Sequence, residues 1–391
     1  MIYLDHAATT QMSEASRQAM EEALSRFYGN PSASYALARA ARSALEEARL
    51  RLSRLLDCDR RALLFTSGGS ESDNQAIHCG AAYGRKTGRR TIICSAFEHP
   101  AVQKSLEALV KEGFRLIALP VYQEGRVRPA DLAAALSQDT CLVTVLHAQN
   151  EVGTLQPIQE LAQLAHETGA IFHTDAVQSV GHVPLSFREL GVDYLSLSAH
   201  KFYGPKGVGA LLIRPEAFQA SFIFGGGQER GLRAGTENVA GVLSMAAALE
   251  EAVAVREEEG RRLEKLRDFL WTGLAPIPGS HRNGSTGPFL PGHLNVSFSG
   301  VPSEEALLLF DAAGIALSAG SACSTGAISA SASLLAMGRS QEEARTALRF
   351  SLGRENTEEE MVQVVKITQQ LVARIRKLHQ GDEPGPCNSK R

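Results

Sequence analysis

The sequence holds few cysteines, and their spacing argues against two common uses of cysteine. The six cysteines of the 391-residue chain are Cys58, Cys79, Cys94, Cys141, Cys323 and Cys387. They include no C-x-x-C pair, and wide spacings in a long chain argue against a disulfide framework. The 11 histidines form neither an H-E-x-x-H motif nor a cluster with zinc spacing, so we expect no metal site. Reduced thiols are typical of the cytosol, which predicts a cytoplasmic protein.

The chain also lacks a large excess of charge of one sign and a long hydrophobic run. Its 40 basic and 43 acidic residues give a net charge of −3, which is too small to indicate a nucleic-acid-binding or membrane-binding surface. The longest smooth apolar stretch, residues 239–249, is too short to span a bilayer. The charged Asp5 interrupts the N-terminal segment, which has no signal-peptide pattern. We therefore expect an intracellular protein with no direct nucleic-acid or membrane partner.

Short apolar segments recur along the first half of the chain, and helical patterns separate them. The expected strands are residues 62–66, 90–95, 114–119, 140–146, 170–174, 194–198 and 209–213. Residues 34–56 repeat alanine, leucine and arginine at helical spacing, which predicts a long amphipathic helix. Strands that are apolar on both faces are typical of a mainly parallel sheet covered by helices. The sequence therefore predicts an α/β fold.

The composition changes near residue 256, which predicts a second domain. Charge density rises over residues 256–267, as expected for a long solvated helix that leads into this domain. A strand is expected at 293–298, and helices at 303–313 and 357–378. The final residues are polar and rich in proline and glycine, which indicates disorder. The expected divisions are a large domain over 15–255, a small domain formed by 1–14 and 256–379, and a disordered tail over 380–391.

Three segments at strand ends carry the residue types of a cofactor site. Gly69 and Ser70 lie between a strand and a helix start, where backbone N–H groups favour a phosphate, although such a pair is often only a turn. Asp175 ends an apolar strand, either as a helix cap or as a buried acid that holds a cationic nitrogen. Lys201 follows another strand, where desolvation would make its amine available for a Schiff base, although most lysines are surface charges. Together they supply what pyridoxal phosphate (PLP) needs, namely a phosphate seat, an acid and a lysine.

Cys323 has different surroundings in the sequence from the other cysteines. It lies among serine, alanine and glycine in residues 316–326, whereas Cys94 and Cys141 lie in apolar segments. A thiol on a loop of small residues can be reactive, and the alternative is that Cys323 is a small filler.

These segments carry a resemblance to a known family. The sequence resembles the cysteine desulfurases of the PLP-dependent class V aminotransferase superfamily, in the subgroup that serves iron–sulfur assembly and nitrogen fixation. The matching motifs are YLDHAATT at 3–10, SGGSESDN at 67–74, EHPAV at 98–102, NEVGT at 150–154, HTDAVQ at 173–178, SAHKFYGPKG at 198–207, GGGQERG at 225–231 and LRFSLG at 348–353. The resemblance implies a fold-type-I PLP transferase, with a mainly parallel central sheet in the large domain and a smaller α+β domain.

The resemblance also implies roles for individual residues. Lys201 would bind PLP covalently and move the Cα proton of the substrate, Asp175 would pair with the pyridinium nitrogen, and Cys323 would accept the sulfur. His99 would stack on the ring and assist proton transfer. The remaining assignments are the phosphate seat of Gly69, Ser70, Ser198 and His200, completed by Thr236 from a partner subunit of a homodimer; Gln178 on the phenolic oxygen; and Arg349 with Asn150 on the substrate carboxylate.

The implied reaction converts L-cysteine to L-alanine and leaves a persulfide on Cys323 for an acceptor protein, such as an iron–sulfur scaffold or a carrier. Position 70 is serine where the family commonly has threonine, and position 149 is glutamine where asparagine is usual. Residues 330–332 read Ala-Ser-Ala where the family often has Pro-Ser-His, which leaves open how acceptors are engaged. A true aminotransferase or selenocysteine lyase would not need Cys323, and an inactive scaffold would not need Lys201.

Overall fold

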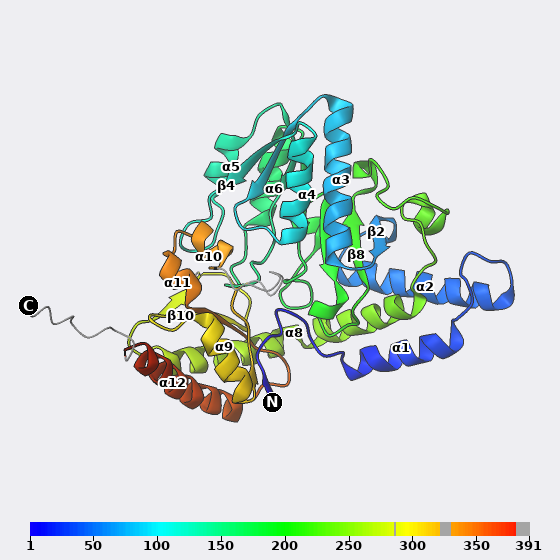
Figure 1. Cartoon of the computed structure of the whole chain (residues 1–391). Coiled ribbons are helices and arrows are strands. Elements are labelled where there is room, and N and C mark those ends of the chain that lie inside the picture. Colours follow the sequence, from blue (N-terminus) through cyan, green and yellow to red (C-terminus); the bar gives the residue numbers. More distant parts are fainter. Residues whose placement is uncertain (285–286, 321–329, 381–391) are drawn as a thin grey trace, which may run out of the picture.

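The computed structural model describes residues 1–284, 287–320 and 330–380. A large sheet with its helices forms one half of the molecule, and a smaller sheet with α9 (Ser303–Ala312) and α12 (Glu358–Gln380) forms the other (Figure 1). The tail predicted from residue 380 falls on residues 381–391, outside the described part, except for its first residue. No helix within the described ranges is both long and apolar enough to cross a membrane.

The large sheet has seven strands in the order β2-β8-β7-β6-β5-β3-β4. Among these strands β8 runs antiparallel to both of its neighbours, and the other pairings are parallel. The predicted mainly parallel α/β sheet is therefore confirmed. The strands are β2 (Leu63–Thr66), β3 (Thr91–Ser95), β4 (Arg115–Leu119), β5 (Thr140–Thr144), β6 (Ile171–Asp175), β7 (Tyr194–Ser198) and β8 (Gly209–Ile213). The exception to the expected burial is β4, which lies at the sheet edge and exposes Arg115 and Ala118.

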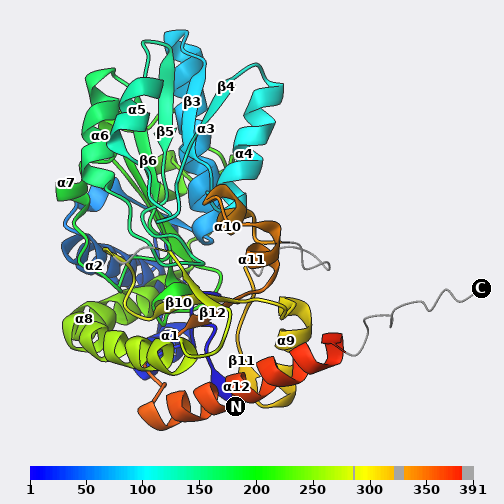
Figure 2. The same ribbon diagram turned by 90° about the vertical axis from the view of Figure 1, so that its left-hand side faces the viewer.

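Helices cover both faces of this sheet, and alternate side chains of each strand enter different cores. Phe172 and Leu195 pack with one hydrophobic cluster, whereas their neighbours Ile171 and Tyr194 pack with another. Figure 2 shows α5, α6 and α7 on one side and α3 and α4 on the other. The helices of this half are α1 (Glu14–Arg26), α2 (Ala36–Leu55), α3 (Gly69–Thr87), α4 (Pro100–Lys111), α5 (Pro129–Ala135), α6 (Ile158–Glu167) and α7 (Phe187–Leu190).

The smaller half joins the start of the chain to its last third. Strand β1 (Ile2–Tyr3) pairs in parallel with β11 (Ile315–Ala316), and Leu4 shares a hydrophobic cluster with Phe310 and Phe350. A second sheet has the order β12-β10-β9. Its strands are β9 (Ser280–Asn283), β10 (His293–Phe298) and β12 (Ala347–Ser351), and the helices are α9 (Ser303–Ala312), α10 (Ala332–Ala336), α11 (Gln341–Arg345) and α12 (Glu358–Gln380).

One helix, α8 (Val239–Leu274), serves both halves. Met245 belongs to the core of the large half, whereas Leu263 and Leu270 belong to the core of the small half. The charged stretch was expected to be a solvated helix, but Leu263 is buried there and Arg267 donates to the Pro291 carbonyl at 2.9 Å. Charge density alone did not reveal the apolar stripe that this stretch presents to the small half. We propose that the two domains join within α8, with the boundary near residue 255.

Two glycines of α8 test how tightly this helix is held. A Cβ added at Gly273 would lie 2.5 Å from Val365 Cγ2 on α12, whereas one at Gly260 would lie 3.6 Å from Pro291 Cγ. Gly260→Ala should raise the free energy of unfolding by about 0.5–1 kcal/mol through helix propensity. Gly273→Ala meets an overpacking cost of about 1–3 kcal/mol and should be the less stable variant in urea unfolding. Equal stability of the two variants would show that α8 and α12 can separate freely.

Candidate active site

A cavity of about 260 Å³ lies at the ends of the central strands β6 and β7 and brings together most of the predicted site residues. Its lining includes Gly69, Ser70, His99, Asn150, Asp175, Gln178, Ser198, His200, Lys201 and Arg349. Two predicted residues are not among them. Thr236 is exposed and lies outside this lining, and Cys323 lies outside the described residues.

Lys201 occupies the short 3-10 helix Ala199–Lys201 that follows β7. Its Nζ donates hydrogen bonds to the carbonyl oxygens of Ala7 at 2.5 Å and Ala8 at 2.8 Å. Gln178 Nε2 also donates to the Ala7 carbonyl, at 2.8 Å. The N-terminal segment is therefore part of the site, a role that the strand-end analysis missed because these contacts use backbone atoms.

Asp175 is the last residue of β6 and is buried beneath the cavity. Its Oδ1 accepts a hydrogen bond from the Val177 N–H at 2.9 Å, so it closes a local turn and also lines the cavity. Burial raises the pKa of this carboxyl, while His99 and Lys201 act in the opposite direction. A cationic nitrogen placed here would favour the ionised carboxylate.

Asp73, on α3, is a cavity residue that the sequence analysis did not single out. It is buried, its Oδ1 has no hydrogen-bond partner within the described chain, and this atom lies 3.6 Å from His173 Nε2. Burial and then the charge of Asp175 hold the pKa of Asp73 well above its ordinary value. Ligand atoms of Asp73, His99 and Asp175 all lie within 4.8 Å of one another. The absence of a metal site stays a prediction, and the three groups form one cluster of titratable side chains in the cavity lining.

His99 caps the N-terminus of α4. Its Nδ1 accepts a hydrogen bond from the Ala101 N–H at 3.2 Å, so a neutral ring carries its proton on Nε2. Burial lowers the pKa of His99, Asp175 opposes that shift and Lys201 adds to it. The lowered pKa favours the neutral imidazole, whose donor is Nε2, and His99 lines the same cavity as Lys201.

The start of α3 offers the predicted phosphate seat. Gly68 precedes the helix at φ +152°, a conformation that favours glycine. Gly69 and Ser70, the first two residues of α3, line the cavity. The N-terminus of this 19-residue helix presents free N–H groups and the positive end of its dipole. Nearby, His200 Nδ1 lies 3.1 Å from Thr9 Oγ1, and burial followed by Lys201 lowers the pKa of His200 to about 4.

Arg349, on β12, comes to the cavity from the small half and is buried. Its Nη2 donates to Asp5 Oδ1 at 2.6 Å, and its Nη1 donates to the Asn150 carbonyl at 3.2 Å. Its buried Nε has no hydrogen-bond partner among the described residues. A guanidinium with an unused donor at the cavity suits a carboxylate. Asp5 was not predicted as its partner, because 344 residues separate the two in sequence.

These residues fit PLP. The helix start and the hydroxyl of Ser198 suit a phosphate, the buried Asp175 suits a protonated ring nitrogen, and the amine of Lys201 suits an aldehyde. Arg349, whose buried Nε has no hydrogen-bond partner among the described residues, supplies a positive charge that would stabilise a bound carboxylate.

Known proteins resemble this chain over nearly its whole length. The sequence profile described as Aminotransferase class-V matches residues 2–364. The cysteine desulfurase IscS of Dictyoglomus turgidum is 42% identical over 390 residues, which are 100% of this chain and 99% of that protein. The cysteine desulfurase IscS of Methanosarcina thermophila is 41% identical over 377 residues, 96% of this chain and 93% of that protein. A solved NifS-like protein superposes with a TM-score of 0.88 and 34% identity, covering 97% of this chain and 99% of that one.

Glu98, behind the cavity, gives the site a testable pH dependence. Burial raises its pKa from 4.5 to about 8, although its Oε1 accepts hydrogen bonds from Ser95 Oγ and from the Leu146 N–H. Between these pH values the folded protein holds a proton that the unfolded chain releases, so this group makes stability fall as pH rises. Its contribution to the slope approaches about 1.4 kcal/mol per pH unit.

Glu98→Gln removes this titration. The free energy of unfolding of the Glu98→Gln holoenzyme, relative to wild type, should therefore increase from pH 5 to pH 8 in urea unfolding. Glu107→Gln, at an exposed glutamate of α4, is the matched control and should differ from wild type by the same small amount throughout. A difference for Glu98→Gln that does not change with pH would mean that Glu98 is not held protonated.

Proposed function

The chain belongs to the class-V aminotransferase family and is a PLP-dependent cysteine desulfurase, and we propose that it releases L-alanine from L-cysteine while Cys323 takes the sulfur. The observation that carries the residue roles is the shared cavity of Lys201, Asp175 and Arg349. These three supply an amine for the cofactor aldehyde, an acid for the ring nitrogen and a cation for the substrate carboxylate. They come from both halves of the molecule.

Each residue has a task that its position supports. Arg349 binds the substrate carboxylate, with its Nη1 steadied by the Asn150 carbonyl. Lys201, near the carbonyls of Ala7 and Ala8, takes the proton from the substrate Cα. Asp175 keeps the proton on the ring nitrogen, and His99 offers the proton on its Nε2. PLP, when bound, withdraws electrons from Cα and so weakens the bonds around it.

The sulfur step balances without an external oxidant. The thiolate of Cys323 attacks the substrate sulfur, so an S–S bond forms and the Cβ–S bond breaks. The electron pair of the broken bond stays on Cβ, which takes a proton and becomes the methyl group of L-alanine. Cβ is reduced while the sulfur atoms are oxidised, and the enzyme is left with a persulfide on Cys323.

The wider context of the enzyme follows from the same proposal. The persulfide would pass to an iron–sulfur scaffold or another carrier protein. In a homodimer, the exposed Thr236 of one subunit would complete the phosphate seat of the other. A nucleophilic thiol needs a reducing compartment, which is consistent with the free thiols of Cys58, Cys79, Cys94 and Cys141 and supports a cytoplasmic location.

Replacement of Asp175 tests the electrostatic part of the proposal. Asp175→Asn keeps an oxygen for the Val177 N–H but removes the charge beside the ring nitrogen. Removing one preorganised electrostatic group commonly costs about 10²–10³ in kcat, so we expect a loss of that order with PLP still bound. The measurement is alanine formation by holoenzyme. Activity within twofold of wild type would reduce Asp175 to its turn-closing role.

Replacement of Cys323 separates sulfur transfer from the rest of the PLP chemistry. Cys323→Ser should bind L-cysteine, visible as a change in cofactor absorbance, but should form no persulfide because a hydroxyl cannot accept sulfur. Mass spectrometry of wild type after brief exposure to L-cysteine should show added sulfur on the Cys323 peptide. Cys58→Ser is the matched control and should react as wild type does. Added sulfur on another cysteine, or a Cys323→Ser variant that still supplies sulfur, would identify a different nucleophile.

A further inference from the structure

Glu151 lies close to residues that precede and follow the Cys323 segment, which is residues 321–329 and lies outside the described chain. The carboxylate of Glu151 is buried, with Oε1 accepting from Ser333 Oγ at 2.7 Å and Oε2 accepting from Ser331 Oγ at 2.6 Å. On the other side of the segment, a Cβ added at Gly320 would lie 3.5 Å from Glu151 Oε2 and 3.5 Å from Ser331 Cβ. Residues 320 and 331 therefore lie beside each other, against one carboxylate.

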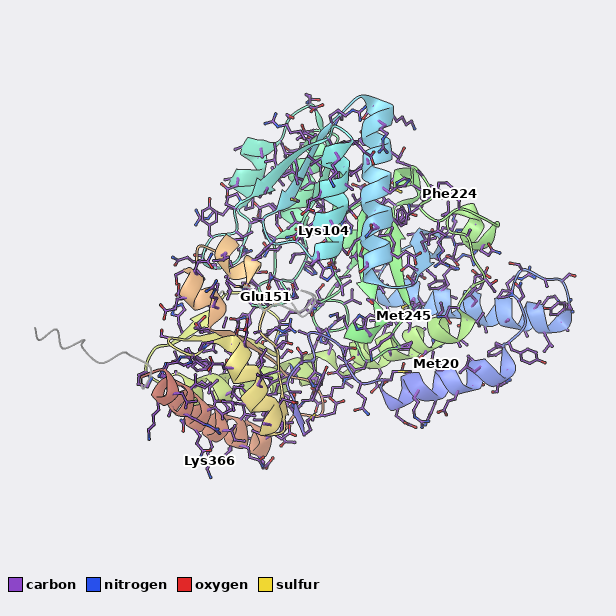
Figure 3. The ribbon with its side chains drawn as sticks, in the orientation of Figure 1. Met20, Lys104, Glu151, Phe224, Met245 and Lys366 are labelled. Atoms are coloured by element: carbon purple, nitrogen blue, oxygen red, sulfur yellow. The ribbon has the colours of Figure 1, made fainter. Side chains whose placement is uncertain are left out.

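The same residue adjoins the substrate-binding part of the cavity. Asn150, the preceding residue, lines the cavity and accepts from Arg349 Nη1. The backbone of Arg349 is tied in turn to Ser318, since the Arg349 N–H donates to the Ser318 carbonyl at 2.7 Å. Figure 3 shows Glu151 at the junction between the large-sheet half and the small half. The Arg349 side chain and the residues on both sides of segment 321–329 thus share one set of contacts.

Gln149 holds Glu151 itself in place. Its Oε1 accepts from the backbone N–H groups of Glu151 at 2.6 Å and Val152 at 2.9 Å. Its Nε2 donates to Ser333 Oγ at 3.0 Å. Ser331 also caps α10, because its Oγ accepts from the Leu334 N–H at 3.1 Å. Both carboxylate oxygens of Glu151 are thereby engaged in a buried network, which fixes geometry more strongly than a surface contact does.

We propose that Glu151 is a positioning residue for sulfur transfer, because it holds Ser331 and Ser333, which follow the Cys323 segment, against the turn that carries Asn150. The proposal rests on the proposed function, since it assumes that Cys323 receives the sulfur. Glu151 is not among the described residues that line the cavity. It acts through Ser331 and Ser333, and so affects the transfer step and not the binding of substrate.

Single-turnover kinetics of Glu151→Gln holoenzyme test whether Glu151 affects sulfur transfer but not substrate binding. The variant should bind PLP and show the cofactor absorbance change with L-cysteine within about twofold of wild type. Persulfide formation on Cys323, measured by rapid quench and mass spectrometry, should slow by about 10–100-fold, because small misplacements of a reacting group have effects of this size. Ser303→Ala, which removes a buried hydroxyl on α9, is the control and should leave both rates unchanged.

The outcomes distinguish this proposal from the proposed function. Wild-type protein that never gains sulfur on Cys323 overturns the function and the positioning role together. Wild-type persulfide formation with an equal rate in Glu151→Gln overturns only the positioning role, as does an equal loss in both readouts. If Glu151→Gln does not fold, Ser333→Ala removes one of the two hydroxyl contacts and should slow persulfide formation selectively, and an unchanged rate overturns the proposal.

Discussion

The site depends on the burial of carboxyl groups beside one lysine. Asp73, Glu98 and Asp175 are all buried, and burial raises the pKa of each. Three ionised carboxylates would repel one another strongly in this region, so burial and this repulsion favour the protonated forms of Asp73 and Glu98. Lys201 favours the charged form of Asp175, and so does His99 when its ring is protonated. In the proposed arrangement, a protonated ring nitrogen of PLP beside Asp175 would add a further compensating positive charge.

The second constraint is that no single part of the chain can build the cavity. The proposed phosphate seat lies at the start of α3, Lys201 follows β7, and Arg349 comes from β12 in the small half. The N-terminal segment closes the arrangement, since Ala7 and Ala8 accept from Lys201 and Asp5 accepts from Arg349. The long helix α8 contributes residues to both hydrophobic cores and so connects the two halves.

Sequence patterns predicted the strands well because buried parallel strands are short, apolar and bounded by polar turns. They predicted Asp175 and Lys201 because functional side chains gather where such strands end. They did not predict Asp73, because the sequence of α3 does not show that this position is buried and not exposed to solvent. They also did not predict Asp5, because its partner Arg349 lies far along the chain. The high charge density of residues 256–267 also led to the prediction of a solvated helix, although Leu263 on α8 is buried. The sequence indicates Glu151 only as part of the motif at 150–154, and its contacts with Ser331 and Ser333 could not be predicted because they depend on tertiary packing.

In the proposed reaction, one cavity removes sulfur from L-cysteine and delivers it to a thiol of the same protein. A single-turnover experiment with purified holoenzyme, L-cysteine and no added reductant tests it most directly. Alanine and protein-bound sulfur, measured in the same quenched samples, should appear in equal amounts and with the same time course. Alanine formed without bound sulfur, or sulfide released together with pyruvate and ammonia in place of alanine, would contradict the account.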